Sequence, residues 1–396
     1  MAHFAQQWGR TSPSRRGPTK SGNGETRMDD PNHYIAEEAE TEYGLVSSYN
    51  EWDPLEEVVV GRIDDAVVPE WHVTLESTMP EVSWDFFRRN GGQRFPQDML
   101  DKAKEEIEGF VRVLRNEGIV VQRPRAVDQQ LPFATPQWQS KGSLYSAMPR
   151  DTFLVVGNDI IEAPMAWRNR YFEPNAFRPL LKGYFKKGAR WTSAPKPELS
   201  DELYRQDFKH PESMAEMMYA VTEFEPVFDA ADFARCGRDI FAQKSNVTND
   251  MGIAWLQRHL GDDYRVHVID VVDTHPMHID ATFTPLAPGK VLINPERINE
   301  LPAMFDNWEK LVPPRPTIDI TQEFSMCSNW IVANTFMLDE KRVFVEASEE
   351  PLLRQFEAWG FEPIPYSLIN FNRFGGGFHC CTLDVRRRGG LESYFE

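Results

Sequence analysis

The sequence predicts an α/β fold built from repeated modules. Three times along the chain, a helical pattern ends at a glycine and a strand-like run follows at once; the glycines are Gly118, Gly261 and Gly360. A glycine just past the last turn is a common helix end, and helices that alternate with strands are typical of α/β proteins. From these patterns alone we expect a doubly wound sheet.

The individual elements follow from the spacing of apolar residues. A first strand is expected at residues 57–61, and a helix from about 97 to 117 has its apolar side chains on one face. A strand should follow this helix at 119–121. Residues 153–161 are typical of a hairpin whose strands join at Gly157 and Asn158. The other helix–strand pairs are expected at 253–260 with 264–272, and at 352–359 with 361–366.

Residues 1–42 have a different composition, rich in Arg, Ser, Gly and Pro, and we expect a disordered tail there. The remaining residues, 43–396, are expected to form one domain. The Arg-rich start is also a property of organelle transit peptides, although Pro13 and Gly17 interrupt an amphipathic helix. We therefore expect a cytoplasmic protein, with a mitochondrial location as the alternative.

The composition excludes several classes of partner. The formal net charge of -18 argues against nucleic acids and anionic membranes, because both bind clustered Lys and Arg. The acidic balance is compatible with a cationic substrate. No apolar run approaches the roughly 18 to 20 residues that a membrane-spanning helix needs, so a soluble protein is expected.

The four cysteines, Cys236, Cys327, Cys380 and Cys381, have neither metal-site spacing nor the density of a disulfide scaffold. They suit a reducing compartment, and no metal is expected. Cys380 and Cys381 follow a glycine run and precede an apolar stretch. If residues 378–385 are extended, alternation places Cys381 on the apolar face and Cys380 on the more polar one. Cys380 is then the candidate reactive thiol, and a buried core cysteine is the alternative.

Acidic and histidine side chains within apolar runs are the other candidates for a site. If residues 277–283 form a strand, alternation places His278 and Asp280 on the same face. Asp229 lies among apolar residues, and Asp151 precedes a strongly apolar strand. Each has a structural alternative: an edge strand with a solvated face for His278 and Asp280, a turn or cap for Asp229, and strand capping for Asp151.

Taken together, several blocks make the chain resemble the arginine:glycine amidinotransferases, from about Tyr43 to the C-terminus. The blocks are Ser146–Asp151, Glu162–Arg168, Phe228–Phe233, Met277–Phe283, Gly375–Cys380 and Asp384–Gly389. The resemblance implies a single catalytic domain that is a five-bladed α/β propeller of ββαβ modules around an active-site channel. It replaces the doubly wound sheet and keeps the repeated modules.

The resemblance also implies roles for residues that match the family's motifs. Cys380 corresponds to the nucleophile, His278 to the general acid and base, and Asp229 to the carboxylate that orients the histidine. Asp151 and Asp280 correspond to the carboxylates that bind the guanidinium group. The amino-acid end of the donor would be held by Arg297 and Ser328, with Cys327 beside them, and the acceptor would lie near His275 and Met277.

The chemistry that the resemblance implies is a ping-pong transfer of the amidino group from L-arginine to glycine, which gives L-ornithine and guanidinoacetate. Cys380 would carry the amidino group between the two half-reactions. A cationic His278 would favour the thiolate of Cys380. No cofactor is implied, because the substrate carries its own positive charge. Family members are commonly homodimers, so a homodimer is expected.

Three departures from the family pattern leave alternatives open. His275 stands where glycine-using relatives are expected to have Asn, Cys327 where they have Ser, and Cys381 where they have Trp. The acceptor could therefore be a different primary amine. An arginine-hydrolysing enzyme of the same superfamily and an inactive arginine-binding protein are the other candidates. A metal site at His379, Cys380 and Cys381 conflicts with the expected alternation, which points these side chains apart.

Overall fold

Five three-stranded sheets repeat one arrangement in the computed structural model, which describes residues 44–322 and 324–395. In each sheet the middle strand pairs antiparallel with one neighbour and parallel with the other. The strands are thus divided among separate small sheets, and the doubly wound sheet expected from the helix–strand pattern alone is wrong. The predicted tail at residues 1–42 lies outside the described residues.

The first sheet joins the two ends of the domain, because β17 (Thr382–Arg387) pairs with β1 (Leu55–Val60), which also pairs with β2 (Val120–Gln122). The other sheets are contiguous in sequence. They are β5 (Phe153–Val156), β6 (Asp159–Glu162) and β7 (Arg190–Ser193); β8 (Phe233–Cys236), β9 (Asp239–Ala242) and β10 (Arg265–Val268); β11 (Phe283–Ala287), β12 (Lys290–Ile293) and β13 (Glu309–Leu311); and β14 (Phe336–Met337), β15 (Arg342–Glu346) and β16 (Glu362–Tyr366). A short hairpin of β3 (Phe133–Ala134) and β4 (Gln139–Ser140) lies apart from them.

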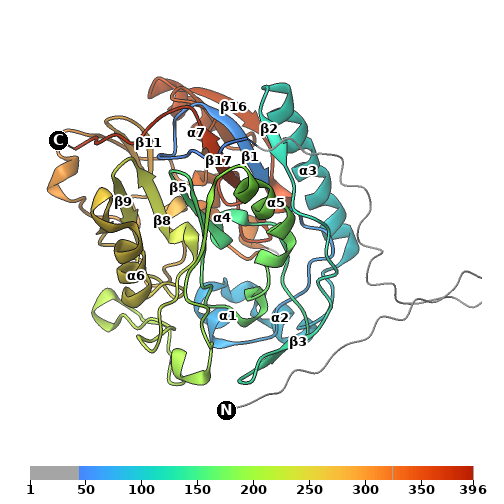
Figure 1. Ribbon diagram of the computed structural model, residues 1–396. Helices are drawn as coiled ribbons and strands as arrows, with labels where there is room; N and C mark the ends of the chain where they lie inside the picture. The colour runs from blue at the N-terminus through green and yellow to red at the C-terminus, as the bar shows by residue number, and fades with distance from the viewer. Residues whose placement is uncertain (1–43, 323, 396) are drawn as a thin grey trace, which may run out of the picture. The chain divides into compact units, whose positions relative to one another are not determined.

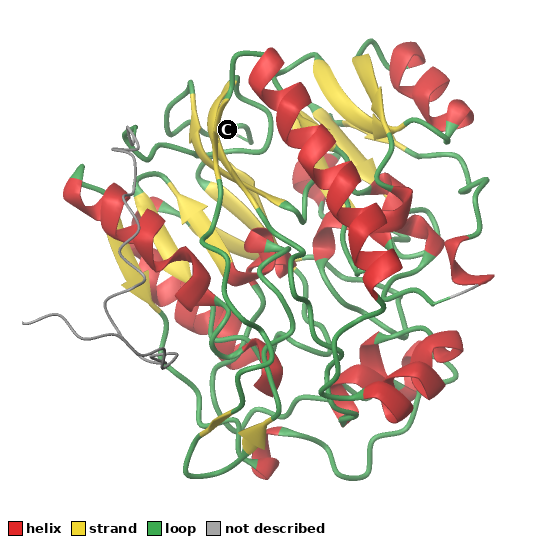
Figure 2. Ribbon diagram, turned by 90° about the vertical axis from the view of Figure 1, so that its right-hand side faces the viewer, coloured by secondary structure: helices red, strands yellow, loops and turns green. Residues whose placement is uncertain are grey.

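Helices make the crossovers between the parallel strands. In chain order these are α3 (Gln97–Asn116), α5 (Pro174–Lys186), α6 (Asp250–Leu260) and α7 (Glu350–Ala358). In Figure 1, α3 lies along one edge of the domain and α6 along the opposite edge, and Figure 2 shows the strands between helices. Between β12 and β13 the only helical element is a 3-10 turn, Ala303–Phe305. Four modules are therefore ββαβ units, and the fourth sheet has a shorter crossover. The remaining α-helices are α1 (Val73–Thr78), α2 (Trp84–Asn90), α4 (Pro149–Thr152) and α8 (Ile369–Asn372).

The helix ends agree with the sequence pattern. α3 buries Leu100, Ala103, Ile107, Phe110 and Leu114, the face expected from their spacing. Each predicted helix-ending glycine has a positive φ, and Gly188 after α5 has one as well. The conformation is accessible to glycine without a side-chain clash, so these residues can end a helix and redirect the chain into the next strand. The predicted hairpin at 153–161 is confirmed as β5 and β6.

Two predicted strands are wrong at the positions that matter for the site. Residues 378–381 form a turn, and β17 begins only at Thr382. Residues 277–282 form a loop and a 3-10 turn, Ile279–Ala281, before β11. The alternation that separated Cys380 from His379, and that aligned His278 with Asp280, therefore does not apply. The predicted strand at 264–272 is also shorter, because β10 ends at Val268.

The segments that precede the antiparallel outer strand of each sheet carry four of the candidate residues and Asn334. Asp151 lies in α4 before β5, Asp229 before β8, Asp280 before β11, Asn334 before β14 and Cys380 before β17. The repeated module therefore presents one polar side chain at the same topological position in each sheet. This explains how residues far apart in the sequence supply a common site.

Apolar side chains fill four separate cores, each formed mainly by parts of neighbouring modules. Cys381 belongs to the largest of them, where its side chain is completely buried, as expected for a core cysteine. Among the residues that the structure describes, no helix combines the length and apolar character of a membrane span.

Candidate active site

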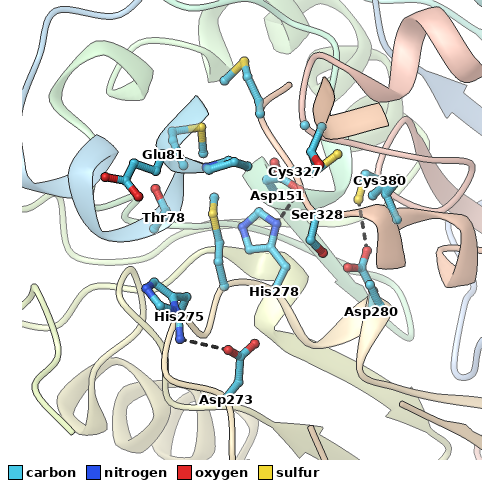
Figure 3. A pocket seen from close by; sticks show the side chains of 18 of the residues that line it. Thr78, Glu81, Asp151, Asp273, His275, His278, Asp280, Cys327, Ser328 and Cys380 are labelled. Atoms are coloured by element: carbon cyan, nitrogen blue, oxygen red, sulfur yellow. Dashed lines mark hydrogen bonds and ion pairs between the residues drawn. The ribbon is translucent and has the colours of Figure 1, made fainter. Parts of the chain in front are cut away.

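A cavity of about 930 Å³ contains every candidate site residue except Asp229, which lies behind His278. Figure 3 shows Cys380 and Asp280 on one side of the cavity, Glu81 and His275 on the other, and His278 between them. The candidate residues that line it are Asp151, His275, Met277, His278, Asp280, Arg297, Cys327, Ser328 and Cys380. The structure thus brings together residues that the sequence spreads over more than half of the chain.

Cys380 is held by the turn that follows the glycine run. Its backbone N–H and that of His379 both donate to the side-chain oxygen of Asn334, at 3.1 and 3.0 Å. A Cβ atom at Gly376 would collide with the sulfur of Met148, and one at Gly377 would lie 2.8 Å from Asn334 Oδ1. The glycines are therefore needed because neighbouring groups approach the backbone closely. The side chain of Cys380 is only 2% exposed.

The thiol of Cys380 donates a hydrogen bond to Asp280 Oδ2, at 3.2 Å. Burial and the nearby carboxylates of Asp280 and Asp151 raise the pKa of Cys380 well above that of an ordinary thiol. Both effects favour the neutral form, because a thiolate here would be poorly solvated and would face negative charges. The effect expected of a cationic His278, which favours the thiolate, is therefore outweighed in the free protein by burial and by these two carboxylates.

His278 has a backbone φ of +58°, which is rare for a residue with a side chain, and it directly precedes the 3-10 turn at Ile279–Ala281. This conformation, and not strand alternation, directs its ring into the cavity. Its Nε2 atom lies 3.0 Å from Asp229 Oδ2, and its Nδ1 atom lies 3.7 Å from Asp151 Oδ1. Burial alone would lower the pKa of His278, but the surrounding carboxylates outweigh it and raise the pKa to about 10.

The carboxylates around His278 have partners that were not expected from the sequence. Arg170 donates to Asp151 Oδ2 at 3.0 Å and forms a two-pronged ion pair with Glu173. Burial raises the pKa of Glu173 to about 7, despite the opposing effect of Arg170. Asp232 lies near Asp229 and accepts hydrogen bonds from Ser245 and Thr248, and burial raises its pKa to about 7.

Asp151 and Asp280 have opposite protonation tendencies. Burial raises the pKa of Asp151, whose Oδ1 atom has no hydrogen-bond partner although it is buried. Burial acts in the same direction on Asp280, but hydrogen bonding and charge from His379 outweigh it and lower the pKa. A carboxylate oxygen without a hydrogen-bond partner and an ionised carboxylate, both at the cavity, are suitable acceptors for a planar cation with several N–H donors.

Arg297 and Ser328 lie together at the cavity, as the family resemblance implies. The Nη2 atom of Arg297 donates to Ser328 Oγ at 3.1 Å, and its Nε atom contacts Asp273 Oδ2 at 3.0 Å. Cys327 is directed instead toward the backbone oxygen of Asn372, at 3.1 Å, and burial raises its pKa to about 12. The thiol of Cys327 is thus a neutral part of the wall.

The opposite side of the cavity has an aromatic and histidine stack. His275 Nε2 lies 3.0 Å from His210 Nδ1, and the ring of His210 stacks on Trp84. Met277 also lines the cavity and is partly buried. His275 and Met277 therefore both line the cavity, and His275 lies across it from the thiol, which is compatible with an acceptor subsite.

Several buried charges at the site were missed from the sequence: Glu51, Arg150, Arg170, Arg235 and His379. Arg235 follows Ala234 in a strand, and a fully buried arginine in an apolar run requires a buried anion nearby. That signal predicts a partner but does not identify it, because Glu51 is far away in the sequence.

In the described part of the chain, no group of three or more His, Cys, Asp or Glu is arranged to hold a metal ion.

Comparisons with known proteins identify the family. The chain is 54% identical over 349 residues to the L-arginine:L-lysine amidinotransferase of Pseudomonas savastanoi pv. phaseolicola, covering 88% of this chain and 96% of the relative. It is 51% identical over 358 residues to the mitochondrial glycine amidinotransferase of Xenopus laevis, with 88% and 85% covered. No family model matches the sequence.

A solved structure agrees with these sequence relatives. An amidinotransferase of the saxitoxin biosynthetic pathway from Microseira wollei superposes with a TM-score of 0.83 at 49% identity, covering 88% of this chain and 99% of that one. The extent and level of identity show common ancestry along almost the whole described domain. The chain therefore belongs to the amidinotransferase family.

Proposed function

We propose that the protein transfers the amidino group of L-arginine to glycine through an amidino group bound to Cys380. The observation that carries the proposal is the placement of one buried thiol, one histidine with a raised pKa and two guanidinium-compatible carboxylates in a single cavity. The vertebrate glycine amidinotransferase at 51% identity supports the choice of acceptor.

Arginine binding would prepare the nucleophile. The guanidinium cation would lie against Asp151 and Asp280 and take the place of the thiol proton as the partner of Asp280. Because the cation offsets the negative charges that raise the pKa of Cys380, the thiol would release its proton to water as the substrate binds and take one up again when the product leaves. The donor's carboxylate would be held by Arg297 and Ser328.

The first half-reaction forms a bond between Cys380 Sγ and the guanidinium carbon and gives a tetrahedral adduct. The bond from that carbon to the ornithine nitrogen then breaks, and protonated His278 donates its proton to the departing nitrogen. Ornithine leaves, the amidino group remains on sulfur, and His278 is neutral. Asp229 keeps the imidazole oriented during this step.

The second half-reaction returns Cys380 and His278 to their states before the first attack. Neutral His278 accepts a proton from the amine of glycine, the amine nitrogen bonds to the amidino carbon, and the bond from carbon to sulfur breaks. Guanidinoacetate leaves, Cys380 becomes a thiolate again, and His278 is again protonated. The groups needed for both steps are supplied by the chain and the two substrates.

The side-chain amine of lysine is a second candidate acceptor. The relative at 54% identity is an L-arginine:L-lysine amidinotransferase, and the cavity extends well beyond the thiol to Glu81 and His275. Glu81 has a carboxylate that could attract a second positive charge on a longer amine. His275, which stands in place of the Asn expected in glycine-using relatives, lies on the same side.

The experiment has two arms. In the first, the protein is incubated with arginine labelled at the guanidino carbon and without an amine, and the digest is examined by mass spectrometry. Label on the Cys380 peptide with stoichiometric ornithine is expected, and no label on Cys380 would contradict the proposal. Steady formation of citrulline and ammonia would identify a hydrolase instead.

The second arm identifies the acceptor. Glycine, lysine and other primary amines are compared as kcat/KM at fixed arginine, with product identification. The largest value for glycine supports the proposal, and the largest value for lysine supports the second candidate. Cys380→Ser serves as the control, since it should form no product with any amine.

We also infer that the five sheets are the blades of an α/β propeller around the cavity. The repeated strand order, and the completion of the first sheet by the C-terminal strand β17, support a ring. The common position of Asp151, Asp229, Asp280 and Cys380 before the antiparallel outer strand of their sheets also supports it.

A further inference from the structure

His379 is placed between two carboxylates directly beside the nucleophile. Its Nδ1 atom lies 2.9 Å from Asp280 Oδ2, and its Nε2 atom lies 3.1 Å from Glu51 Oε2. The side chain is 5% exposed, so water does not compete for either contact. A neutral imidazole has only one N–H, but both contacts require a donor because ionised carboxylates only accept. The doubly protonated imidazolium satisfies both contacts.

The surroundings of His379 favour this charge state. The charged groups that face it are Glu51 from the segment before β1, Arg150 from α4 and Asp280 from the turn before β11. Burial and Arg150 lower the pKa of His379, but the two hydrogen-bonded carboxylates outweigh them, and the net pKa is raised.

Glu51 is itself held as an anion. Arg235 forms a two-pronged contact with it, at 2.9 and 2.7 Å, and Arg150 lies 3.6 Å away. Burial would raise the pKa of Glu51, but these arginines outweigh it and the pKa lies well below the usual range. His379 therefore cannot relieve its second contact by transferring the proton to Glu51.

The same oxygen of Asp280 accepts from both His379 and the thiol of Cys380, at 2.9 and 3.2 Å. A fixed positive charge on the imidazole that donates to this oxygen favours the ionised form of Asp280. It also leaves Asp280 oriented toward the thiol. Without that charge, burial would raise the pKa of Asp280, opposed only by the weaker effects of His278 and Asn334.

We propose that His379 is a positioning residue that acts as a permanent imidazolium between Glu51 and Asp280, keeping Asp280 ionised and directed at the guanidinium subsite. The role of His379 in catalysis rests on the proposed function, because it operates through Asp280 as a guanidinium-binding carboxylate. His379 does not touch the reacting atoms. It is distinct from His278, which exchanges protons with the substrates.

The charge state is tested by nuclear magnetic resonance of the unsubstituted protein with ¹⁵N-labelled histidine. The chain has nine histidines, and the signal missing from His379→Asn assigns His379. Both ring nitrogens are expected to stay protonated from slightly acidic to slightly alkaline pH. A ring with one unprotonated nitrogen in this range would overturn the inference.

The effect of His379 on Asp280 is tested by measuring arginine binding to the Cys380→Ala variant, in which no transfer occurs. In the double variant with His379→Asn, the affinity for arginine should fall more steeply on acidification than in Cys380→Ala alone, because Asp280 then takes up a proton. The added loss should approach tenfold for each pH unit below the new pKa of Asp280. If His379→Asn lowered the affinity for arginine equally at every pH, or did not lower it, the inference would be overturned.

The matched control is His267→Asn in the same background. His267 also contacts a buried aspartate, with Nε2 2.7 Å from Asp239 Oδ1, but it lies on β10 and does not line the cavity. The His267→Asn substitution should leave the pH dependence of arginine binding unchanged.

If Cys380→Ala itself binds no arginine, the proposed function fails, while the nuclear magnetic resonance experiment still decides the charge state of His379. His379→Gln replaces His379→Asn if the latter does not fold.

Discussion

The thiol of Cys380 lies 3.2 Å from Asp280 Oδ2, so the nucleophile faces a carboxylate and not a cation. The contact couples two requirements of the proposed reaction. A charged Asp280 attracts the guanidinium group, and the same charge opposes the thiolate until a cation arrives. Substitution of Asp280 should therefore affect substrate binding and thiol ionisation in opposite directions.

Asp280→Asn should make Cys380 more reactive in the absence of substrate and weaken arginine binding. Removal of the negative charge lowers the pKa of the thiol, so iodoacetamide should modify Cys380 faster at neutral pH. In the Cys380→Ala background, the loss of a charge-assisted contact should raise the Kd for arginine about tenfold to hundredfold. Peptide mass spectrometry measures the first effect, with Cys327 as internal reference, and calorimetry the second. Unchanged alkylation and affinity would contradict the assignment.

The raised pKa of His278 predicts a pH-dependent contribution to stability. Its pKa is about 10 in the folded protein against 6.5 for an ordinary histidine, so the stabilisation is complete below pH 6.5 and is lost as the pH rises through 10. The difference in unfolding free energy between the parent and His278→Gln should therefore shrink from pH 6.5 to pH 10. Urea unfolding at both ends of this range measures it. A difference that grows with pH would mean that His278 is neutral in the fold.

The sequence predicted the helices well and the active-site turns poorly. Long periodic patterns such as that of α3 depend on local spacing, so its limits at Gln97–Asn116 were close to those expected. The turns that carry Cys380 and His278 are short and lie beside apolar runs, so their residue pattern predicts strands. The positive φ of His278 and the Asn334 contacts that fix the Cys380 turn come from tertiary packing, which leaves no periodic signal.

Family motifs predicted the candidate site residues. They did not predict the buried charged side chains that contact those residues. Cys380, His278, Asp151 and Asp280 lie in short recognisable blocks, and the structure places all of them at one cavity. The partners of the buried charges come from distant segments, as in the contact of His379 with Glu51. Only the folded chain shows that the thiol of Cys380 is surrounded by carboxylates that raise its pKa.

Arg297→Lys should weaken arginine binding without abolishing transfer at saturating arginine. Lysine keeps the charge but lacks the planar fork with which Arg297 can bind a carboxylate while it contacts Ser328 and Asp273. The KM for arginine should rise about tenfold, and kcat should change much less. Arg315→Lys is the control, because Arg315 pairs with Glu296 in solvent. A fall in kcat with an unchanged KM would place Arg297 in the chemical step.

His275→Asn should change the second half-reaction alone. His275 lies across the cavity from Cys380, and its contacts with His210 and Thr274 keep it on that side. The shorter amide should raise kcat/KM for glycine, by about tenfold if one polar contact decides acceptor fit. The kcat/KM for arginine should stay unchanged, since arginine reacts first in a ping-pong cycle. Initial rates with each substrate varied in turn measure both values, and a parallel change in the two would contradict an acceptor role.

Substitution of the two adjacent cysteines should affect different properties: Cys380 the transfer reaction, and Cys381 the stability of the fold. Cys380→Ala should abolish ornithine release while the protein still binds arginine, because the nucleophile is lost and the carboxylates remain. Cys381→Ala should keep the transfer reaction and lower the free energy of unfolding by about 1 kcal/mol, since its buried sulfur fills core volume. Single-turnover assays and urea unfolding of both variants distinguish the roles. Loss of transfer in a folded Cys381→Ala protein would show that the neighbouring sulfur also takes part, because removal of a core sulfur alone leaves Cys380, His278 and both carboxylates in place.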